Sequence, residues 1–206
     1  MPQTRPALAP TALEPDGPRD RILCQIPLHD LVVASFSHGL ANLVAQLDKA
    51  TKDADRRGES PEALLDARLA PHMPSLAQEI GLACQQARDC VAALFGEAPP
   101  RPPRTDTPAR VRDAIEATLA ELWECDRSRL DAASRRAVTL ELPDGDTFDL
   151  GGRQYVRDWA VPQFYLHLVS AYAILRARGA PVGDADYAAH MIRYLRPSSQ
   201  ERPDAV

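Results

Sequence analysis

Apolar side chains recur every three or four residues along most of this chain, the spacing that places them on one face of an α-helix. The stretch from Gln163 to Gly179 is apolar on nearly every side, so it should lie at the centre of the fold. Several long helices with short and long connections favour an all-α four-helix bundle. The side chains predicted to face the core are Val33, Phe36, Leu40, Leu43, Leu47, Leu76, Ile80, Ala83, Ala87, Val91, Leu94, Val111, Ile115, Leu119 and Leu122.

Prolines set the expected limits of the folded domain. Residues 1–23 are rich in proline and lack a hydrophobic period, so they are predicted to be a flexible leader, and residues 196–206 a flexible tail. A single domain then occupies residues 24–195. Within its last long helix, Pro162 predicts a kink or a new helix start.

One segment alternates like a β-strand instead of following a helical period. In AVTLELPDGDTFDLGG, residues 137–152, apolar residues alternate on both sides of Asp144 and Gly145, a dipeptide typical of a hairpin turn. We expect a small β-hairpin that covers one end of the bundle. Further along, Asp184 is expected to cap a short C-terminal helix.

Composition restricts the classes of partner. The chain has 206 residues, 45% of them hydrophobic, which is enough for a core, and its formal net charge of -5 leaves no basic stripe for nucleic acid. No apolar run is long enough to cross a bilayer, so a soluble, cytoplasmic protein without nucleic-acid or membrane partners is expected. The cysteines form no CxxC pair and are interpreted as reduced thiols: Cys24, Cys84, Cys90 and Cys125.

Three blocks of the chain resemble an uncharacterised family of helical bundles. HGLANLVAQLDKA (38–50), ARLAPHM (67–73) and VPQFYLHLVSAYAILRARGAPVG (161–183) are similar to DUF1993, a domain of unknown function within the DinB/YfiT-like superfamily. The resemblance covers about residues 27–187. It implies a DinB-like four-helix bundle, and therefore a fold and not an activity.

Members of this superfamily typically hold a metal with three histidines, two of them four residues apart on one helix, and some act with thiol cofactors. In this chain Gln163 and Ala171 stand four residues before and after His167, so the paired histidines are missing. The family resemblance also leads us to expect aspartate where His72 stands, glutamine at Glu79 and asparagine at Gln163. His167 is retained, and the departures mark positions where adaptation of this member is expected.

Four polar side chains are predicted to converge in one cavity between helices: His72, Glu79, Gln163 and His167. His72 is expected at the beginning of a helix, where the dipole favours a neutral imidazole that can act as a base or ligand. Either His72 or Glu79 would be the base, and His167 the acid or the substrate anchor. The alternative for His167 is a core imidazole bonded to a carbonyl or a carboxylate.

Further substrate contacts are expected from Tyr165, Tyr172, His29 and Asp158. The two tyrosines equally fit core positions with the hydroxyl at the edge, and His29 fits the core stripe of the first helix. Asp158 lies on the opposite face of its helix from His167, so the two need the kink at Pro162 to meet. No metal or other cofactor is predicted.

Three functions fit these observations. The first is a small-molecule-binding bundle with metal-independent acid/base chemistry, of isomerase, lyase or cyclase type. The second is a degenerate DinB-like metal- or thiol-dependent transferase that uses His72 and His167 with Gln163 or Glu79. The third is a non-catalytic dimeric stress or accessory protein. A small-molecule ligand is the expected partner and a homodimer the assembly considered, and the chain has no GxSxG, P-loop or GxGxxG motif.

Overall fold

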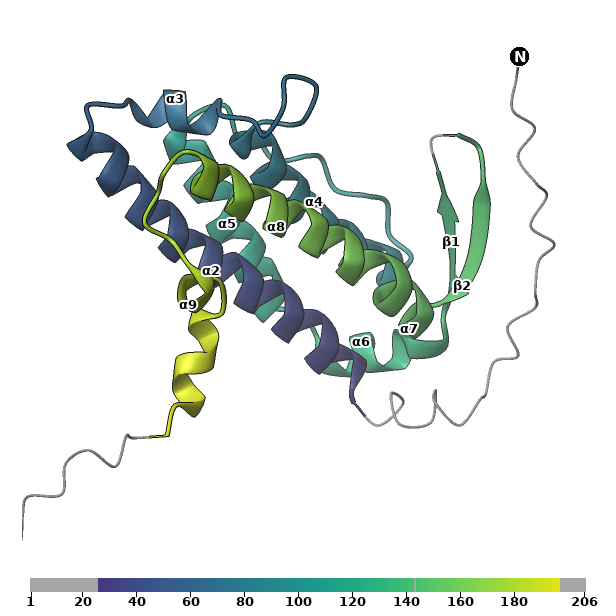
Figure 1. Ribbon diagram of the computed structural model, residues 1–206. Helices are drawn as coiled ribbons and strands as arrows, with labels where there is room; N and C mark the ends of the chain where they lie inside the picture. The colour runs from purple at the N-terminus through teal and green to yellow at the C-terminus, as the bar shows by residue number, and fades with distance from the viewer. Residues whose placement is uncertain (1–25, 143, 197–206) are drawn as a thin grey trace, which may run out of the picture.

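The structure, a computed structural model, describes residues 26–142 and 144–196. Long helices form an elongated bundle (Figure 1): α2 (Leu28–Arg56), α4 (Leu76–Phe95), α5 (Pro108–Trp123) and α8 (Val161–Ala177). Both α2 and α4 pack against α5 and α8, which closes the bundle and confirms the predicted fold class. Within the described ranges, none of the helices combines the length and apolarity needed to cross a membrane.

The predicted leader, residues 1–23, lies outside the described residues, as does the predicted tail beyond Arg196. The limits expected for the folded domain therefore stay predictions. Inside those limits, local sequence signals begin and end the long helices.

Helix α4 shows these signals most completely. The Ser75 hydroxyl accepts the backbone N–H of Gln78, and the Gln78 side chain accepts the backbone N–H of Ser75, so two N–H groups at the helix start are satisfied reciprocally. The helix ends at Gly96, whose φ of 67° is a left-handed conformation that favours glycine. Thr107 caps α5 in the same manner as Ser75, by accepting the N–H of Arg110.

The core lies between the four long helices. Phe36 and Phe164 pack with ring centroids 4.8 Å apart where α2 meets α8. A Cβ atom at Gly39 would lie 2.7 Å from Cε1 of Phe164, so glycine in mid-helix allows this close approach. The largest fully buried side chains are Phe36, Phe164, Leu28, Leu40, Leu43, Leu64, Leu76, Ile80, Leu94, Ile115, Leu122 and Leu130.

The last long helix continues through Pro162. A short helix, α7 (Gly152–Tyr155), leads into a π-helical segment (Val156–Ala160) and then directly into α8. Pro162 has no N–H to donate to the carbonyl four residues earlier, and its ring crowds that carbonyl, so a wider turn fits there. The disturbance expected at this proline is therefore a π-turn within an unbroken helix.

Helices α4 and α8 run in opposite directions. The beginning of α7 lies against the end of α4, since a Cβ atom at Gly152 would lie 3.0 Å from Cδ2 of Leu94. The same atom would lie 2.2 Å from the carbonyl oxygen of Ala133, so only glycine fits at this crossing. Glu79, near the beginning of α4, consequently faces the middle of α8.

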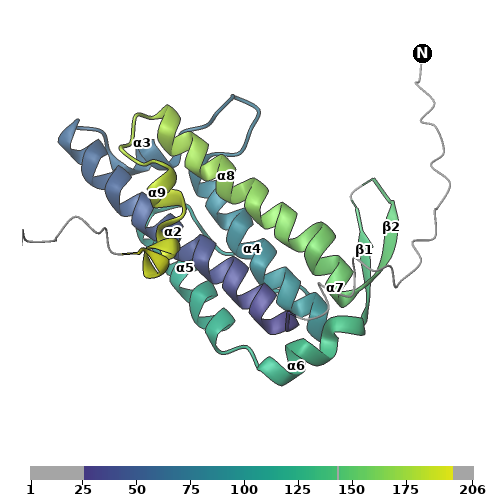
Figure 2. The ribbon, with the colours of Figure 1, turned by 60° about the horizontal axis from the view of Figure 1, so that its bottom comes forward.

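Smaller elements occupy the ends of the bundle. A short helix, α3 (Pro61–Leu65), lies near the end of α2, and α6 (Arg127–Ala132) follows α5 at the other end. The predicted hairpin is present as β1 (Ala137–Glu141) and β2 (Thr147–Gly151), paired antiparallel with Val138 opposite Leu150. Figure 2 shows the hairpin projecting beyond the end of the bundle. Most of its side chains are exposed, and it packs on that end through the buried Val138 and the half-buried Leu140 and Leu150.

The C-terminal segment crosses α2 as α9 (Asp184–Tyr187) followed by a 3-10 helix (Ala189–Tyr194) (Figure 1). The cap of α9 is Gly183 and not Asp184 as predicted. The backbone N–H of Gly183 donates to the Asp186 carboxylate at 2.9 Å. Gly183 adopts the extended backbone that a cap requires, so the helix is capped one residue earlier in the chain than expected.

Asn42, buried on α2, holds this segment in place. Its Nδ2 donates to the carbonyl of Tyr187 at 2.7 Å, and its Oδ1 accepts the backbone N–H of His190 at 3.1 Å. The rings of His38 and His190 stack with centroids 4.7 Å apart. Asn42 is 5% exposed, so its carboxamide is a buried polar group whose partners come from the C-terminal segment.

Candidate functional site

Glu79 and His167 meet at the interface of α4 and α8. Oε2 of Glu79 lies 2.8 Å from Nδ1 of His167. Glu79 stands in the first turn of α4, where the helix dipole favours a negative charge. The Glu79 side chain is 4% exposed and the His167 side chain 19% exposed. The carboxylate is therefore enclosed, while part of the imidazole reaches the surface.

A carboxylate at Nδ1 determines which ring nitrogen of His167 carries hydrogen. An ionised carboxylate only accepts hydrogen bonds, so Nδ1–H donates to Glu79. In the neutral ring Nε2 then has no hydrogen, and it has no hydrogen-bond partner within residues 26–142 and 144–196. This is the arrangement in which an imidazole accepts a proton at Nε2 while a carboxylate orients the ring.

Gln163 lies one helical turn before His167 on the same face of α8. It is half-buried, and its carboxamide has no hydrogen-bond partner in the part of the chain that the structure describes. A carboxamide both donates and accepts hydrogen bonds. Gln163 can therefore bind a polar group that lies beside the imidazole of His167.

His72 lies in a turn before α4 and not on the helix itself. The helix begins at Leu76, so the expected effect of the helix dipole on the His72 ring does not apply. His72 is exposed and lines a cleft of about 530 Å³ between α4 and the proline-rich connector, together with Gln85 and Pro102. Leu82, which also lines this cleft, is one helical turn from Glu79.

The two tyrosines of α8 point away from the Glu79–His167 pair. Tyr165 donates to the carbonyl of Ser35 on α2 at 3.5 Å, and burial raises the pKa of its hydroxyl. The Tyr172 hydroxyl lies 3.4 Å from Oδ1 of Asp184, and its ring packs edge-on against Tyr187. Tyr165 thus contacts α2 and Tyr172 contacts the C-terminal segment, whereas His167 faces α4.

His29 and Asp158 are also separate from the pair. The backbone N–H of His29 donates to Oδ1 of Asp131 at 2.9 Å, and its ring lies 3.1 Å from the carboxylate of Asp30. His29 therefore sits where α2 meets α6. Asp158 is exposed in the π-helical segment and accepts a hydrogen bond from the adjacent Arg157 at 2.6 Å. The structure does not bring either residue to His167.

Burial lowers the reactivity of the described cysteine thiols. Burial raises the pKa of the Cys84 thiol to about 11 and also raises the pKa of Cys90 and Cys125. All three are free thiols, and a thiol with a raised pKa is a weak nucleophile and a weak ligand. The fourth cysteine, Cys24, lies outside the described residues.

A cavity of about 320 Å³ lies between α2, α3 and α5 and was not predicted from the sequence. A signal for it exists on α2, because Thr51 follows Leu47 by four residues and so places a hydroxyl on the apolar stripe. The second signal is Ser60, which caps α3 by accepting the N–H of Ala63 and thereby places this short helix at the end of the two long ones.

Comparison with known proteins assigns the chain to a family. The family model for a domain of unknown function, DUF1993, matches residues 28–188. The chain belongs to this family. A crystal structure of a DinB family member protein from Shewanella denitrificans is 33% identical to it, with a TM-score of 0.70 over 78% of this chain and 91% of that chain. The predicted family and DinB-like fold are confirmed. None of the curated proteins matches the chain.

The described residues of the DUF1993 chain do not form the three-histidine metal site that the DinB-like superfamily implies. Among the described residues, no group of three or more His, Cys, Asp or Glu side chains is placed to hold a metal ion. Nδ1 of His167 is engaged by Glu79, and Gln163 supplies a carboxamide where a second histidine would stand. These donors do not fit the site, so we assign no catalytic step to a metal.

Proposed function

We propose that this DUF1993 protein binds a small molecule and transfers protons on it, with His167 as the general base and acid. The observation that carries the proposal is the 2.8 Å contact between Glu79 Oε2 and His167 Nδ1. Because Glu79 is enclosed and engaged with the ring, we assign it the role of positioning His167. This differs from the prediction from sequence, in which Glu79 or His72 was the base.

The proposed chemistry needs only one ring nitrogen. Nε2 of His167 takes a proton from the ligand, and the imidazolium that forms keeps its Nδ1–H on the Glu79 carboxylate. Returning the proton to a different atom of the ligand gives an isomerisation. Returning it to a leaving group or to a newly closed ring gives an elimination or a cyclisation. Each of these reactions balances without an added oxidant or reductant.

Two further residues would recognise the ligand. Gln163, one turn from His167, would bind a polar group through its unpaired carboxamide. His72 would contact the far end of a ligand that extends over Leu82 into the neighbouring cleft. Support for this arrangement comes from Leu82, which lies one helical turn from Glu79 and also lines the cleft of His72.

A second candidate function is a non-catalytic bundle that associates with a second copy of the chain. Leu166 and Val169 on α8 are 57% and 47% exposed, and Leu82 on α4 is 40% exposed, which favours an apolar contact on this side. In that case the Glu79–His167 pair would serve only to join α4 to α8. The two candidates differ in whether His167 transfers protons on a bound ligand.

Proton exchange in heavy water tests the first candidate. Small metabolites that raise the melting temperature of the protein would be incubated with it in D2O, and deuterium incorporation into their C–H groups followed by NMR. We expect exchange to fall by at least about tenfold in His167→Ala and in Glu79→Leu. Gln163→Ala should weaken binding of the same compounds more than it slows exchange in the bound state.

The matched control is His29→Ala, which removes another histidine that lies beside a carboxylate. It should leave exchange unchanged, since His29 is located where α2 meets α6. Equal exchange by the wild type and His167→Ala would overturn the acid/base proposal. If no metabolite exchanges and the protein is dimeric, with Leu166→Glu yielding monomers, the second candidate is favoured.

A further inference from the structure

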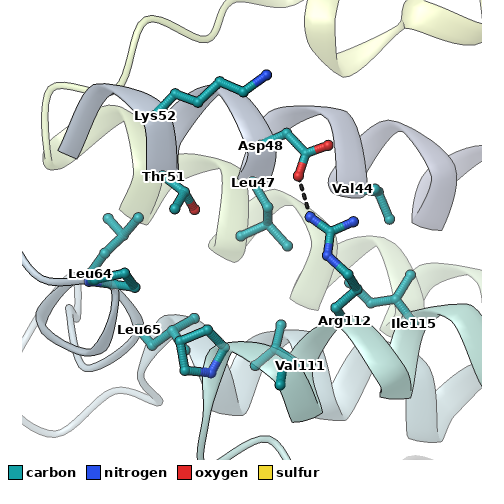
Figure 3. A pocket seen from close by; sticks show the side chains of 13 residues that line it. Val44, Leu47, Asp48, Thr51, Lys52, Leu64, Leu65, Val111, Arg112 and Ile115 are labelled. Atoms are coloured by element: carbon teal, nitrogen blue, oxygen red, sulfur yellow. Dashed lines mark hydrogen bonds and ion pairs between the residues drawn. The ribbon is translucent and has the colours of Figure 1, made fainter. Parts of the chain in front are cut away.

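The cavity between α2, α3 and α5 lies on a different side of the bundle from the Glu79–His167 pair, which joins α4 to α8. Its volume is about 320 Å³, within the range of ligand-binding pockets in proteins. Figure 3 shows the side chains that surround it. Its apolar lining comes mainly from Val44, Leu47, Leu64, Leu65, Val111 and Ile115.

The charged side chains of the cavity do not face its interior. Asp48 of α2 and Arg112 of α5 form an ion pair that joins the two helices, so their charges balance (Figure 3). Lys52 also belongs to the lining, but its amine points away from the space between Leu47 and Val111 (Figure 3). A cationic group inside the cavity would therefore lose its hydration without gaining a free carboxylate, because Asp48 is already paired with Arg112.

One polar group does face the cavity. The Thr51 side chain projects from α2 toward this space (Figure 3), and its hydroxyl has no hydrogen-bond partner in the described parts of the chain. A hydroxyl can both donate and accept one hydrogen bond. The cavity thus presents an apolar surface with a single hydrogen-bonding position near its wall.

We propose that this cavity is a second ligand site, which takes an uncharged, largely apolar molecule with one hydrogen-bonding group. A volume of about 320 Å³ accommodates on the order of ten non-hydrogen atoms, at about 30 Å³ each. A medium-chain alcohol has this size and this distribution of polarity. Its chain would lie against Leu64, Leu65 and Ile115, and its hydroxyl would bond to Thr51. The inference is independent of the acid/base proposal, since it uses none of the same residues.

Methyl NMR spectra of the full chain test the site with 1-octanol as the probe. We expect saturable shifts of the Leu47, Val111 and Ile115 methyl signals, and intermolecular NOEs from Val111 and Ile115 to the octyl chain. Octanoate and octylamine have the same chain with a charged end. Octylamine should bind at least about tenfold more weakly than 1-octanol, because the Asp48 carboxylate of the lining is already paired with Arg112, whereas octanoate could pair with the Lys52 amine.

Two substitutions test the position and the polar contact. Thr51→Val keeps the shape of the side chain and removes the hydroxyl, so 1-octanol should bind about three- to tenfold more weakly. Leu47→Trp should fill the cavity and abolish the shifts. Leu166→Trp places the same indole on an exposed position of α8 and should leave binding unchanged.

Three results would overturn the inference. The first is the absence of saturable shifts and of NOEs at Val111 and Ile115 in the wild-type chain, a result that depends on no variant. The second is octylamine binding as tightly as 1-octanol, which would contradict the ligand class. The third is a folded Leu47→Trp protein that keeps its affinity, which would place the probe elsewhere.

Discussion

Glu79 and His167 are separated by 88 residues in the sequence, yet their side chains meet at 2.8 Å between α4 and α8. The capping box at Ser75 places Glu79 in the first turn of α4, and the π-turn before Pro162 belongs to the same unbroken helix as His167. The single imidazole in the apolar helix α8 is therefore paired with an enclosed carboxylate.

Substitutions at the two members of this pair should lower stability by unequal amounts. His167→Ala leaves the enclosed Glu79 carboxylate without its partner and should lower the free energy of unfolding by about 1–3 kcal/mol. Glu79→Gln keeps an oxygen that accepts from Nδ1–H and should cost less than about 1 kcal/mol. Urea denaturation measures both values, and a larger loss for Glu79→Gln than for His167→Ala would contradict this account.

The close approach of α2 and α8 depends on Gly39. Gly39→Ala would place a Cβ atom 2.7 Å from Cε1 of Phe164 and 3.0 Å from Cδ2 of Leu168, so the core must shift. We expect a loss of about 1–3 kcal/mol in the free energy of unfolding. Gly183→Ala is the matched control, because a Cβ atom there has no neighbour closer than 3.9 Å. Comparable losses for the two variants would show that helix approach at Gly39 is not limiting.

Docking of the C-terminal segment on α2 should weaken in acid. Burial lowers the pKa of His38 below its usual 6.5, and electrostatic interactions with the neighbouring His190 and Arg193 lower it further. The undocked form therefore takes up a proton first as the pH falls, so docking weakens progressively below about pH 6.5 and is unaffected above it.

Hydrogen exchange reports this docking through the backbone N–H of His190, which donates to Asn42 at 3.1 Å. Its protection factor should be lower at about pH 5 than at about pH 7.5. His38→Gln should abolish most of this difference, and Asn42→Ala should lower protection at both pH values. Equal protection of the wild-type amide at both pH values would rule out this role of His38.

The buried thiols should resist alkylation. The pKa of Cys84 is raised to about 11 and that of Cys90 is also raised, in both cases mainly by burial, so little thiolate forms in the native state. Iodoacetamide at about pH 8 should modify them far more slowly in the folded protein than in urea. Peptide mass spectrometry measures both rates for each cysteine. Rapid modification of Cys84 in the native state would show that α4 opens locally.

The helical part of the fold was predictable because burial follows the apolar period closely. Leu76 and Ile80 lie on the predicted stripe of α4 and are fully buried, and Ser75 and Gly96 mark its ends. The cap of the last short helix was predicted one residue late, since Asp184 and Gly183 are both ordinary cap residues. Local sequence therefore predicts the presence of each helix more reliably than the residue at which the helix begins.

The site was predictable only in part. Glu79 and His167 were both placed at helix edges that face a neighbour, and their contact depends on the antiparallel pairing of α4 with α8. Tyr165 and Tyr172 lie on the same helix as His167, but Tyr165 contacts α2 and Tyr172 contacts the C-terminal segment. The helical period of the sequence cannot reveal which neighbouring element a side chain contacts. The length of the turn that carries His72 is likewise set by tertiary packing.

The central claim is that Glu79 holds His167 with hydrogen on Nδ1 and leaves Nε2 ready to accept a proton. Nitrogen-15 NMR of the imidazole at about neutral pH measures this directly, because protonated and unprotonated ring nitrogens have distinct shifts. We predict that the form of the His167 ring with a single N–H carries it on Nδ1 and leaves Nε2 unprotonated, and that Glu79→Leu shifts this form toward N–H on Nε2. A wild-type ring with hydrogen on Nε2, or one unaffected by Glu79→Leu, would contradict the account.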